Sequence, residues 1–288
     1  MKKAVLALLA FSLILSSCVH KSPFETEYYF QALGEDNELV ITADAVKLKE
    51  SYPSFSSDAV ISRADRINLA LTSEEEGMVG LSDYSLSGAL EGNYGTILVN
   101  TAISMLDGFE KEKEGDLKYY TNGEFSLYVP KTGILLFTDS DYASFYDRTI
   151  ENRKIMIPFE TASNLASSMF SIFIRNPRTM LSLGFDIPLA TLMEVDTLIA
   201  SINERDGSFT LDATFLMKSE RSANTLTNLL RTMLVTNIRK SGGALDFDLL
   251  SNMLYKEGSA VIVSGMNIER ATVDSITQNA MNMIGGVM

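Results

Sequence analysis

Residues 206–240 read DGSFTLDATFLMKSERSANTLTNLLRTMLVTNIRK, a stretch that predicts a β-hairpin leading into a long amphipathic helix. Asp206-Gly207 is typical of a two-residue hairpin turn, because such turns need positive φ angles that Asp and Gly tolerate. Apolar and polar side chains then alternate from Phe209 to Met217, which is the period of a strand with one buried face. Beyond Ser219, a residue type that caps helices, apolar side chains recur at helical spacing at Ala223, Leu226, Leu230, Leu234 and Ile238.

The same order of elements occurs in the first half of the chain, which predicts a tandem duplication. The second half is predicted to contain a short strand, a helical turn, two hairpin strands and a helix, at 170–174, 176–183, 192–202, 209–217 and 219–240. In the first half the corresponding elements are predicted at 38–42, 44–50, 61–71, 84–90 and 97–106. Each half is therefore predicted to be a β-α-β-β-α unit, with residues 37–107 superposing on residues 168–240.

Each predicted unit continues with further strands and helices. The first continues with three strands and a helix, at 117–120, 125–129, 134–137 and 141–149. The second continues with a helix, a strand and a closing helix, at 248–255, 260–264 and 268–283. Strand pairs interleaved with helices predict an α+β fold of antiparallel sheets with helices packed on one face. The expected organisation is a signal peptide, a lipidated tether, a first α+β module and a second α+β module, at 1–17, 18–35, 36–150 and 151–288.

The N-terminus has the features of an export signal. Lys2 and Lys3 precede an apolar run, residues 4–15, that is too short to span a bilayer. Leu15-Ser16-Ser17-Cys18 follows and resembles the lipobox of bacterial lipoproteins. The resemblance implies cleavage before Cys18, acylation of its sulfur and amine by fatty acids such as palmitate, and attachment to a membrane. Val19, where inner-membrane lipoproteins of enteric bacteria have Asp, favours the outer membrane.

An unmodified Cys18 next to an ordinary signal-peptidase site is the alternative interpretation. Against it, Cys18 is the only cysteine in 288 residues and stands where the lipobox requires one. Three acyl chains would anchor the protein stably, since a single chain binds membranes only marginally. Cys18 is therefore the predicted lipidation site.

The charge of the chain limits its partners. The formal net charge is −13, and cleavage before Cys18 removes Lys2 and Lys3 and no acid, which leaves −15. Nucleic-acid binding needs a basic surface, and anionic lipids attract basic clusters, so the sequence predicts neither kind of contact. The expected partners are the membrane, through the N-terminal lipid, and an envelope protein.

Most catalytic motifs are missing from the predicted modules. His20 is the only histidine and lies in the tether, so the modules contain neither imidazole nor thiol. This excludes Ser-His-Asp and Cys-His catalysis and His-based zinc sites within them. The sequence also lacks the glycine-rich phosphate loops and the G-x-S-x-G nucleophile motif. We predict no catalytic, cofactor-binding or metal-binding residue.

Carboxylates and tyrosines are the remaining candidates for a site. Glu74–Glu76 and the Glu/Lys run 110–116 are interpreted as solvated segments, and Asp141 as a helix cap rather than a Ca²⁺ ligand, because the rest of a Ca²⁺ loop is missing. Tyr119, Tyr120 and Tyr128 fall on neighbouring predicted strands and are interpreted as packing on a sheet face.

Three classes of function stay open. The favoured one is a membrane-anchored envelope lipoprotein with a non-catalytic binding or structural role, facing the periplasm or the cell surface. The second is a carrier that encloses a lipid or another apolar ligand. The third is a carboxylate-dependent hydrolase, which would need two acids in one cleft. We predict that the protein is not an enzyme, because general acid-base catalysis near neutral pH usually relies on histidine.

Overall fold

The computed structural model describes residues 29–33, 39–52, 60–72, 84–153, 157–175, 187–205, 207–240 and 247–274. The predicted signal peptide, Cys18, His20 and the acidic segment Glu74–Glu76 lie outside the described residues. The predicted helical turn 176–183 also lies outside them.

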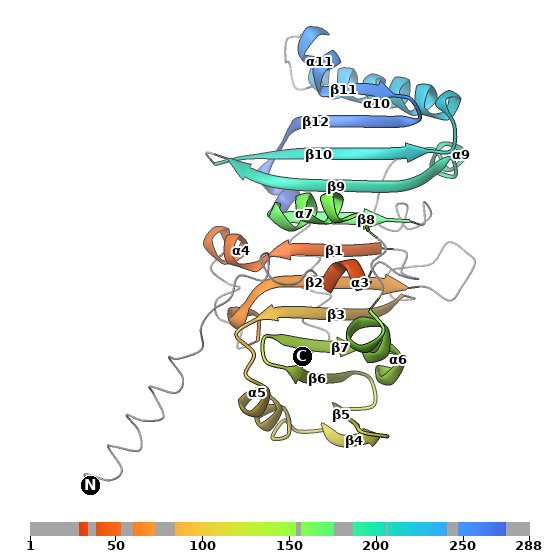
Figure 1. The fold of residues 1–288 in the computed structure, drawn as a ribbon. Coiled ribbons are helices and arrows are strands. Elements are labelled where there is room, and N and C mark those ends of the chain that lie inside the picture. The colour runs from red at the N-terminus through yellow and green to blue at the C-terminus, as the bar shows by residue number, and fades with distance from the viewer. Residues whose placement is uncertain are drawn as a thin grey trace.

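The described strands form one twelve-stranded sheet in which every pair is antiparallel. The strands are β1 (Leu39–Asp44), β2 (Ala64–Thr72), β3 (Ser85–Gly92), β4 (Glu110–Glu114), β5 (Leu117–Thr121), β6 (Ser126–Lys131), β7 (Ile134–Thr138), β8 (Phe170–Ile174), β9 (Val195–Arg205), β10 (Ser208–Met217), β11 (Leu254–Glu257) and β12 (Ala260–Ile268). Figure 1 shows them as a tall ladder with β11 near the top and β4 at the bottom.

The helices are short except for one. They are α3 (Tyr29–Leu33), α4 (Ala45–Ser51), η2 (Ile61–Arg63), α5 (Thr96–Ile103), α6 (Tyr142–Tyr146), η4 (Asp147–Glu151), α7 (Phe159–Ser167), α9 (Leu189–Leu192), α10 (Glu220–Lys240) and α11 (Phe247–Met253). Residues 270–274 are also helical and lie within the predicted closing helix 268–283, although Ile268 belongs to β12; residues 275–283 are outside the described residues. No described helix has both the length and the apolar content needed to span a membrane.

The two halves of the sheet have the same strand order. β1 and β8 pair at the centre, with Ile41 opposite Ile172. From this pair outward the order is β1-β2-β3-β7-β6 on one side and β8-β9-β10-β12-β11 on the other, while β5 and β4 extend only the first side. This order agrees with the predicted repeat; the duplication itself, the superposition of the two units and the module boundary at residue 150 stay predictions.

The predicted α+β class is confirmed, with helices covering both faces of the sheet rather than the one expected. Side chains of a strand alternate between the faces, so Leu39 and Ile41 join the cluster under α4, α5 and α10, whereas Val40 joins the cluster under α3, α6 and α7. Figure 1 shows α3, α6 and α7 on the face toward the viewer. The physical reason lies in strands such as β1 and β7, which are buried at every position and therefore need cover on both faces.

Local predictions agree with the structure where the periodicity is strong. Ser219 caps α10 by accepting a hydrogen bond on its Oγ from the Ser222 N–H at 3.1 Å, and Ala223 and Leu226 are fully buried. The Glu/Lys run 110–116 was interpreted as a solvated turn, and residues 110–114 are all exposed as expected but form strand β4 instead of a turn. Helix α7 was not expected, and the predicted helix 141–149 is divided into α6 and the π-helix η4.

Buried polar side chains fasten two helices to the sheet. Arg66 on β2 donates from Nη1 to Thr42 Oγ1 at 2.6 Å and from Nη2 to the Ala166 carbonyl oxygen of α7. The neighbouring Asn68 donates from Nδ2 to Glu91 Oε1 at 2.8 Å, and the same oxygen accepts from the Tyr29 N–H of α3 at 3.3 Å. Because buried polar groups are stable only when hydrogen-bonded, this network fixes α3 and α7 over the sheet.

Candidate functional site

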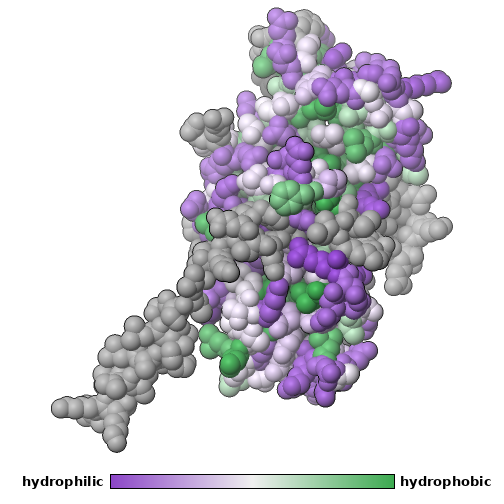
Figure 2. Space-filling model, in the orientation of Figure 1, coloured by the Kyte–Doolittle hydropathy of each residue, from purple (hydrophilic) through white to green (hydrophobic). Residues whose placement is uncertain are grey.

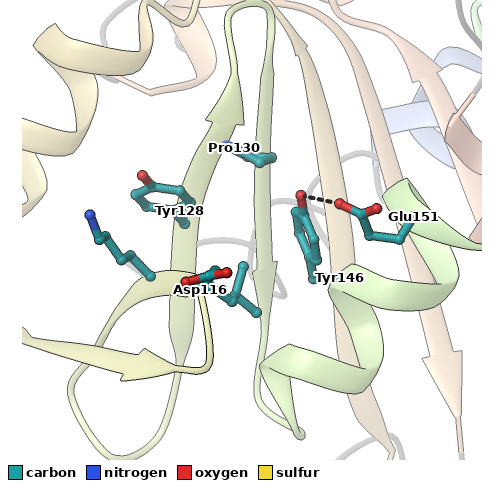
Figure 3. Close-up of a pocket in the computed structure, with 7 residues that line it drawn as sticks. Asp116, Tyr128, Pro130, Tyr146 and Glu151 are labelled. Atoms are coloured by element: carbon teal, nitrogen blue, oxygen red, sulfur yellow. Dashed lines mark hydrogen bonds between the residues drawn. The ribbon is translucent and has the colours of Figure 1, made fainter.

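A pocket of about 330 Å³ lies at the β4 end of the sheet. Three segments that are distant in sequence form it: the β4–β5 turn with the start of β5, strand β6, and the end of α6 with η4. Its lining consists of Asp116, Leu117, Lys118, Tyr128, Pro130, Tyr146 and Glu151. In Figure 3, Tyr128 and Tyr146 lie on opposite sides of the pocket, with Asp116 between and below them.

The π-helix η4 positions one acid of the pocket. Tyr146 donates from its hydroxyl to Glu151 Oε1 at 2.9 Å, a hydrogen bond between residues five apart (Figure 3). In an α-helix such residues point about 140° away from each other. The π turn, closed by the Asn152 N–H bonding to the Asp147 carbonyl oxygen at 2.7 Å, brings them together. Such π turns occur frequently at functional sites.

Strand β6 contributes its wall through an irregular stretch. The pairing of β6 with β7 shifts register between Tyr128 and Lys131. Pro130 lies in this stretch, where the ladder tolerates a residue without an N–H. Tyr128, which still pairs with Leu136, and Pro130 both line the pocket.

A buried tyrosine lies behind the lining. Tyr142 is 2% exposed, and its ring stacks on Tyr119 with centroids 4.9 Å apart. Burial raises the pKa of Tyr142 well above its usual value, and the neighbouring Tyr146 and Tyr128 raise it further. These two neighbours line the pocket, whereas Tyr142 itself is not among the lining residues. The Tyr142 hydroxyl has no hydrogen-bond partner among the described residues.

Acidic side chains create a negative field at this end of the sheet. Burial raises the pKa of Tyr119, and the charges of Glu114, Glu112 and Asp141 raise it further. The pKa of Tyr146 is likewise raised by burial and then by Glu151. Ionisation of a phenol adds a negative charge, and the carboxylates near Tyr119 and Tyr146 oppose it by raising the pKa of both phenols. The same carboxylates therefore disfavour an anion at this site.

Two residues considered in the sequence analysis, Tyr128 and Asp116, line the pocket. Tyr128 was predicted only to pack on a sheet face, and it also lines the pocket. Asp116 was predicted only to be solvated, and it is also part of the lining. Asp141 is confirmed as the cap of α6, since its Oδ2 accepts from the Ser144 N–H at 2.8 Å. Tyr146 and Glu151 were not anticipated, because a five-residue spacing carries no helix-face signal unless a π turn is known.

The described residues contain no group of three metal-ligating side chains. No metal-ion site is therefore proposed among them.

A second surface feature lies on α5. The predicted helix at 97–106 is present, but Ile97 is 85% exposed and Met105, just beyond the helix, is 76% exposed. Leu98 and Leu106 add to this apolar patch. Figure 2 shows hydrophobic side chains at the lower left, where α5 lies in Figure 1. The apolar side chains of α5 are thus divided, with Ile97 and Leu98 exposed and with Val99 and Ile103 packed against the core.

The α+β architecture is similar to that of solved structures. Crystal form I of TP0453 matches with a TM-score of 0.57 and 11% identity, over 87% of this chain and 96% of that chain. Crystal form IV of TP0453 matches with a TM-score of 0.57 and 10% identity, over 89% of this chain and 99% of that chain. At this identity the likeness shows a shared fold and nothing finer. No protein-family model matches the sequence, and a search of curated proteins finds no match.

Proposed function

We propose that the protein is an envelope lipoprotein, anchored by lipid on Cys18 and favoured in the outer membrane, that binds a partner without catalysis. The observation that carries the binding role is the pocket at the β4 end. It is held by strands β5 and β6 and by the hydrogen-bonded α6–η4 segment, so its walls are preorganised. Preorganised walls favour binding because little conformational freedom is lost when a ligand enters.

The chemistry of the pocket supports binding over turnover. Its two carboxylates, Asp116 and Glu151, are both exposed, whereas a carboxylate that acts as an acid near neutral pH usually needs burial or a close like charge. Neither imidazole nor thiol belongs to the lining.

The pocket bears on the two alternative functions, an apolar-ligand carrier and a carboxylate-dependent hydrolase, in different ways. The polar lining argues against this pocket as the cavity of an apolar-ligand carrier, since such cavities are mainly apolar. A carboxylate-dependent hydrolase gains one specific observation, because Asp116 and Glu151 line the same pocket. We therefore retain the hydrolase as the second candidate.

The anchor is tested by changing Cys18→Ser. The wild-type protein is expected in the membrane fraction and labelled by a fatty-acid analogue, and the variant is expected in the soluble fraction without label. Persistent labelling of the variant would refute lipidation at Cys18.

The binding role is tested by cross-linking the acylated protein in intact envelopes and recovering its partner. Tyr146→Phe, which removes the hydroxyl that holds Glu151, is expected to reduce recovery of that partner at unchanged thermal stability. A hydrolase screen with the same protein is expected to show no turnover. Turnover that disappears in Glu151→Gln, with the fold intact, would overturn the proposal in favour of the hydrolase.

A further inference from the structure

We propose that the pocket binds an organic ammonium group, held by carboxylates and by tyrosine rings. This inference rests on the proposed binding role and names its ligand class. Two acids from separate segments, Asp116 in the β4–β5 turn and Glu151 in η4, lie in one lining that has a single cation, Lys118. The lining therefore has a formal charge of −1 before its neighbours are considered.

The surroundings make the site more favourable for a cation. Burial raises the pKa of Tyr119, which follows the lining residue Lys118 on β5, and the negative charges of Glu114, Glu112 and Asp141 raise it further. A positive ligand reduces this concentration of like charge, whereas an anion increases it.

Three basic side chains near this end lie over other rings. Arg153 is 4.9 Å and Lys131 is 5.6 Å from the ring centroid of Tyr29, and Arg148 is 5.5 Å from that of Phe145. No described cation lies over Tyr128 or Tyr146. The two rings that flank the pocket in Figure 3 can thus accept a cation from outside.

The acceptors and the size of the pocket limit the ligand that it can hold. An ammonium N–H in the pocket would point its donors toward phenol oxygens and carboxylates, which are acceptors. The volume of about 330 Å³ is at the small end of the range for ligand pockets, which suits an alkylammonium group rather than a large lipid.

The test uses the full acylated protein in detergent and isothermal titration calorimetry. The probes are 1,4-diaminobutane and tetramethylammonium, with 1,4-butanediol as a neutral control and acetate as an anionic one. We expect saturable binding of both cations and none of the controls. Asp116→Asn and Glu151→Gln are each expected to weaken binding at least tenfold, and Tyr128→Leu to weaken tetramethylammonium binding more than diamine binding.

Glu124→Gln is the matched control, because Glu124 is an exposed acid in the β5–β6 turn outside the pocket lining. It removes the same charge and is expected to change affinity less than twofold. Equal effects of Glu124→Gln and Glu151→Gln, or binding of the controls in place of the cations, would overturn the inference. Thermal unfolding of each variant verifies that the fold is intact.

Two further arms identify the source of the ammonium. A lysine-containing peptide and its Nε-acetylated form distinguish a protein side chain from a free amine. Binding of the unmodified peptide but not of the acetylated one supports a basic segment of a partner protein. Binding of the diamine but of neither peptide supports a small metabolite. Partner recovery that persists while all cations fail to bind would refute the ammonium site and leave the proposed binding role standing.

Discussion

Replacing Gly88 by alanine provides the sharpest test of the packing described above. Gly88 on β3 lies directly opposite Phe137 on β7, whose ring is 3% exposed. A Cβ added at Gly88 would lie less than 3.0 Å from three atoms of that ring, a distance that real Cβ atoms essentially never show. Since no positive φ is required at Gly88, the destabilising effect of the substitution is steric.

The expected loss follows from overpacking. Forcing an extra carbon into a filled core costs about 1–3 kcal/mol, and we expect Gly88→Ala to lower the free energy of unfolding by about 2 kcal/mol. In a Phe137→Ala background, which itself costs about 3–5 kcal/mol, the clash is absent. There Gly88→Ala is expected to be neutral or to stabilise by about 0.5 kcal/mol, because glycine in a strand is unfavourable.

Urea unfolding followed by far-ultraviolet circular dichroism measures all four proteins of this double-mutant cycle. With a slope of about 3 kcal/mol/M, the single variant should unfold at a midpoint lower by about 0.7 M. A coupling energy of about 2–3 kcal/mol between the two positions is expected. The same loss in both backgrounds, or an unchanged midpoint in the single variant, would refute the reasoning.

Two further variants test the local interactions. Asp141→Ala removes the cap of α6 and is expected to lower the free energy of unfolding by about 1 kcal/mol at neutral pH. The hydrogen bonds from Ser144 lower the pKa of Asp141 below 3.8, so this contribution is present above pH 3.8 and is lost as the pH falls through the lower folded pKa. The difference in stability between wild type and variant should therefore disappear in acid. Arg66→Lys cannot keep the hydrogen bonds to both Thr42 and the Ala166 carbonyl oxygen. The variant is expected to lower the free energy of unfolding by about 2–3 kcal/mol and to raise deuterium uptake in α7. Unchanged uptake in α7 would contradict the role of Arg66 in holding this helix on the sheet.

Sequence patterns predicted the elements that bury one clear face. The alternation in β10 and the helical spacing in α10 each have a partner surface, so local period and tertiary packing agree. Strand β4 lacked such a signal because all its side chains are charged and exposed; only its pairing with β5 makes it a strand. The apolar spacing of α5 predicted a helix correctly but carried no information about how much of that apolar surface the fold would cover.

The pocket was harder to anticipate because no single segment encodes it. Asp116, Tyr128 and Glu151 come together through the register of β5 and β6 and through the π turn of η4. The register depends on contacts between segments, and the π turn depends on one extra residue in a helix. Neither of these two features leaves a periodic pattern in the sequence.

The charges of β4 also bear on how copies of the protein meet. Among the described strands, β4 ends the sheet on one side, while at the other end α10 and α11 pack against β11. Two copies joined at β4 in an antiparallel, two-fold symmetric way, centred on Glu112, would place Glu112 opposite itself, Lys111 opposite Lys113 and Glu110 opposite Glu114. Every pair in that register has like charges, which destabilises directly opposed residues. The alternating charges of β4 therefore restrict how two copies can pair at this edge, because they disfavour this register, whereas a shift by one residue would place Glu opposite Lys.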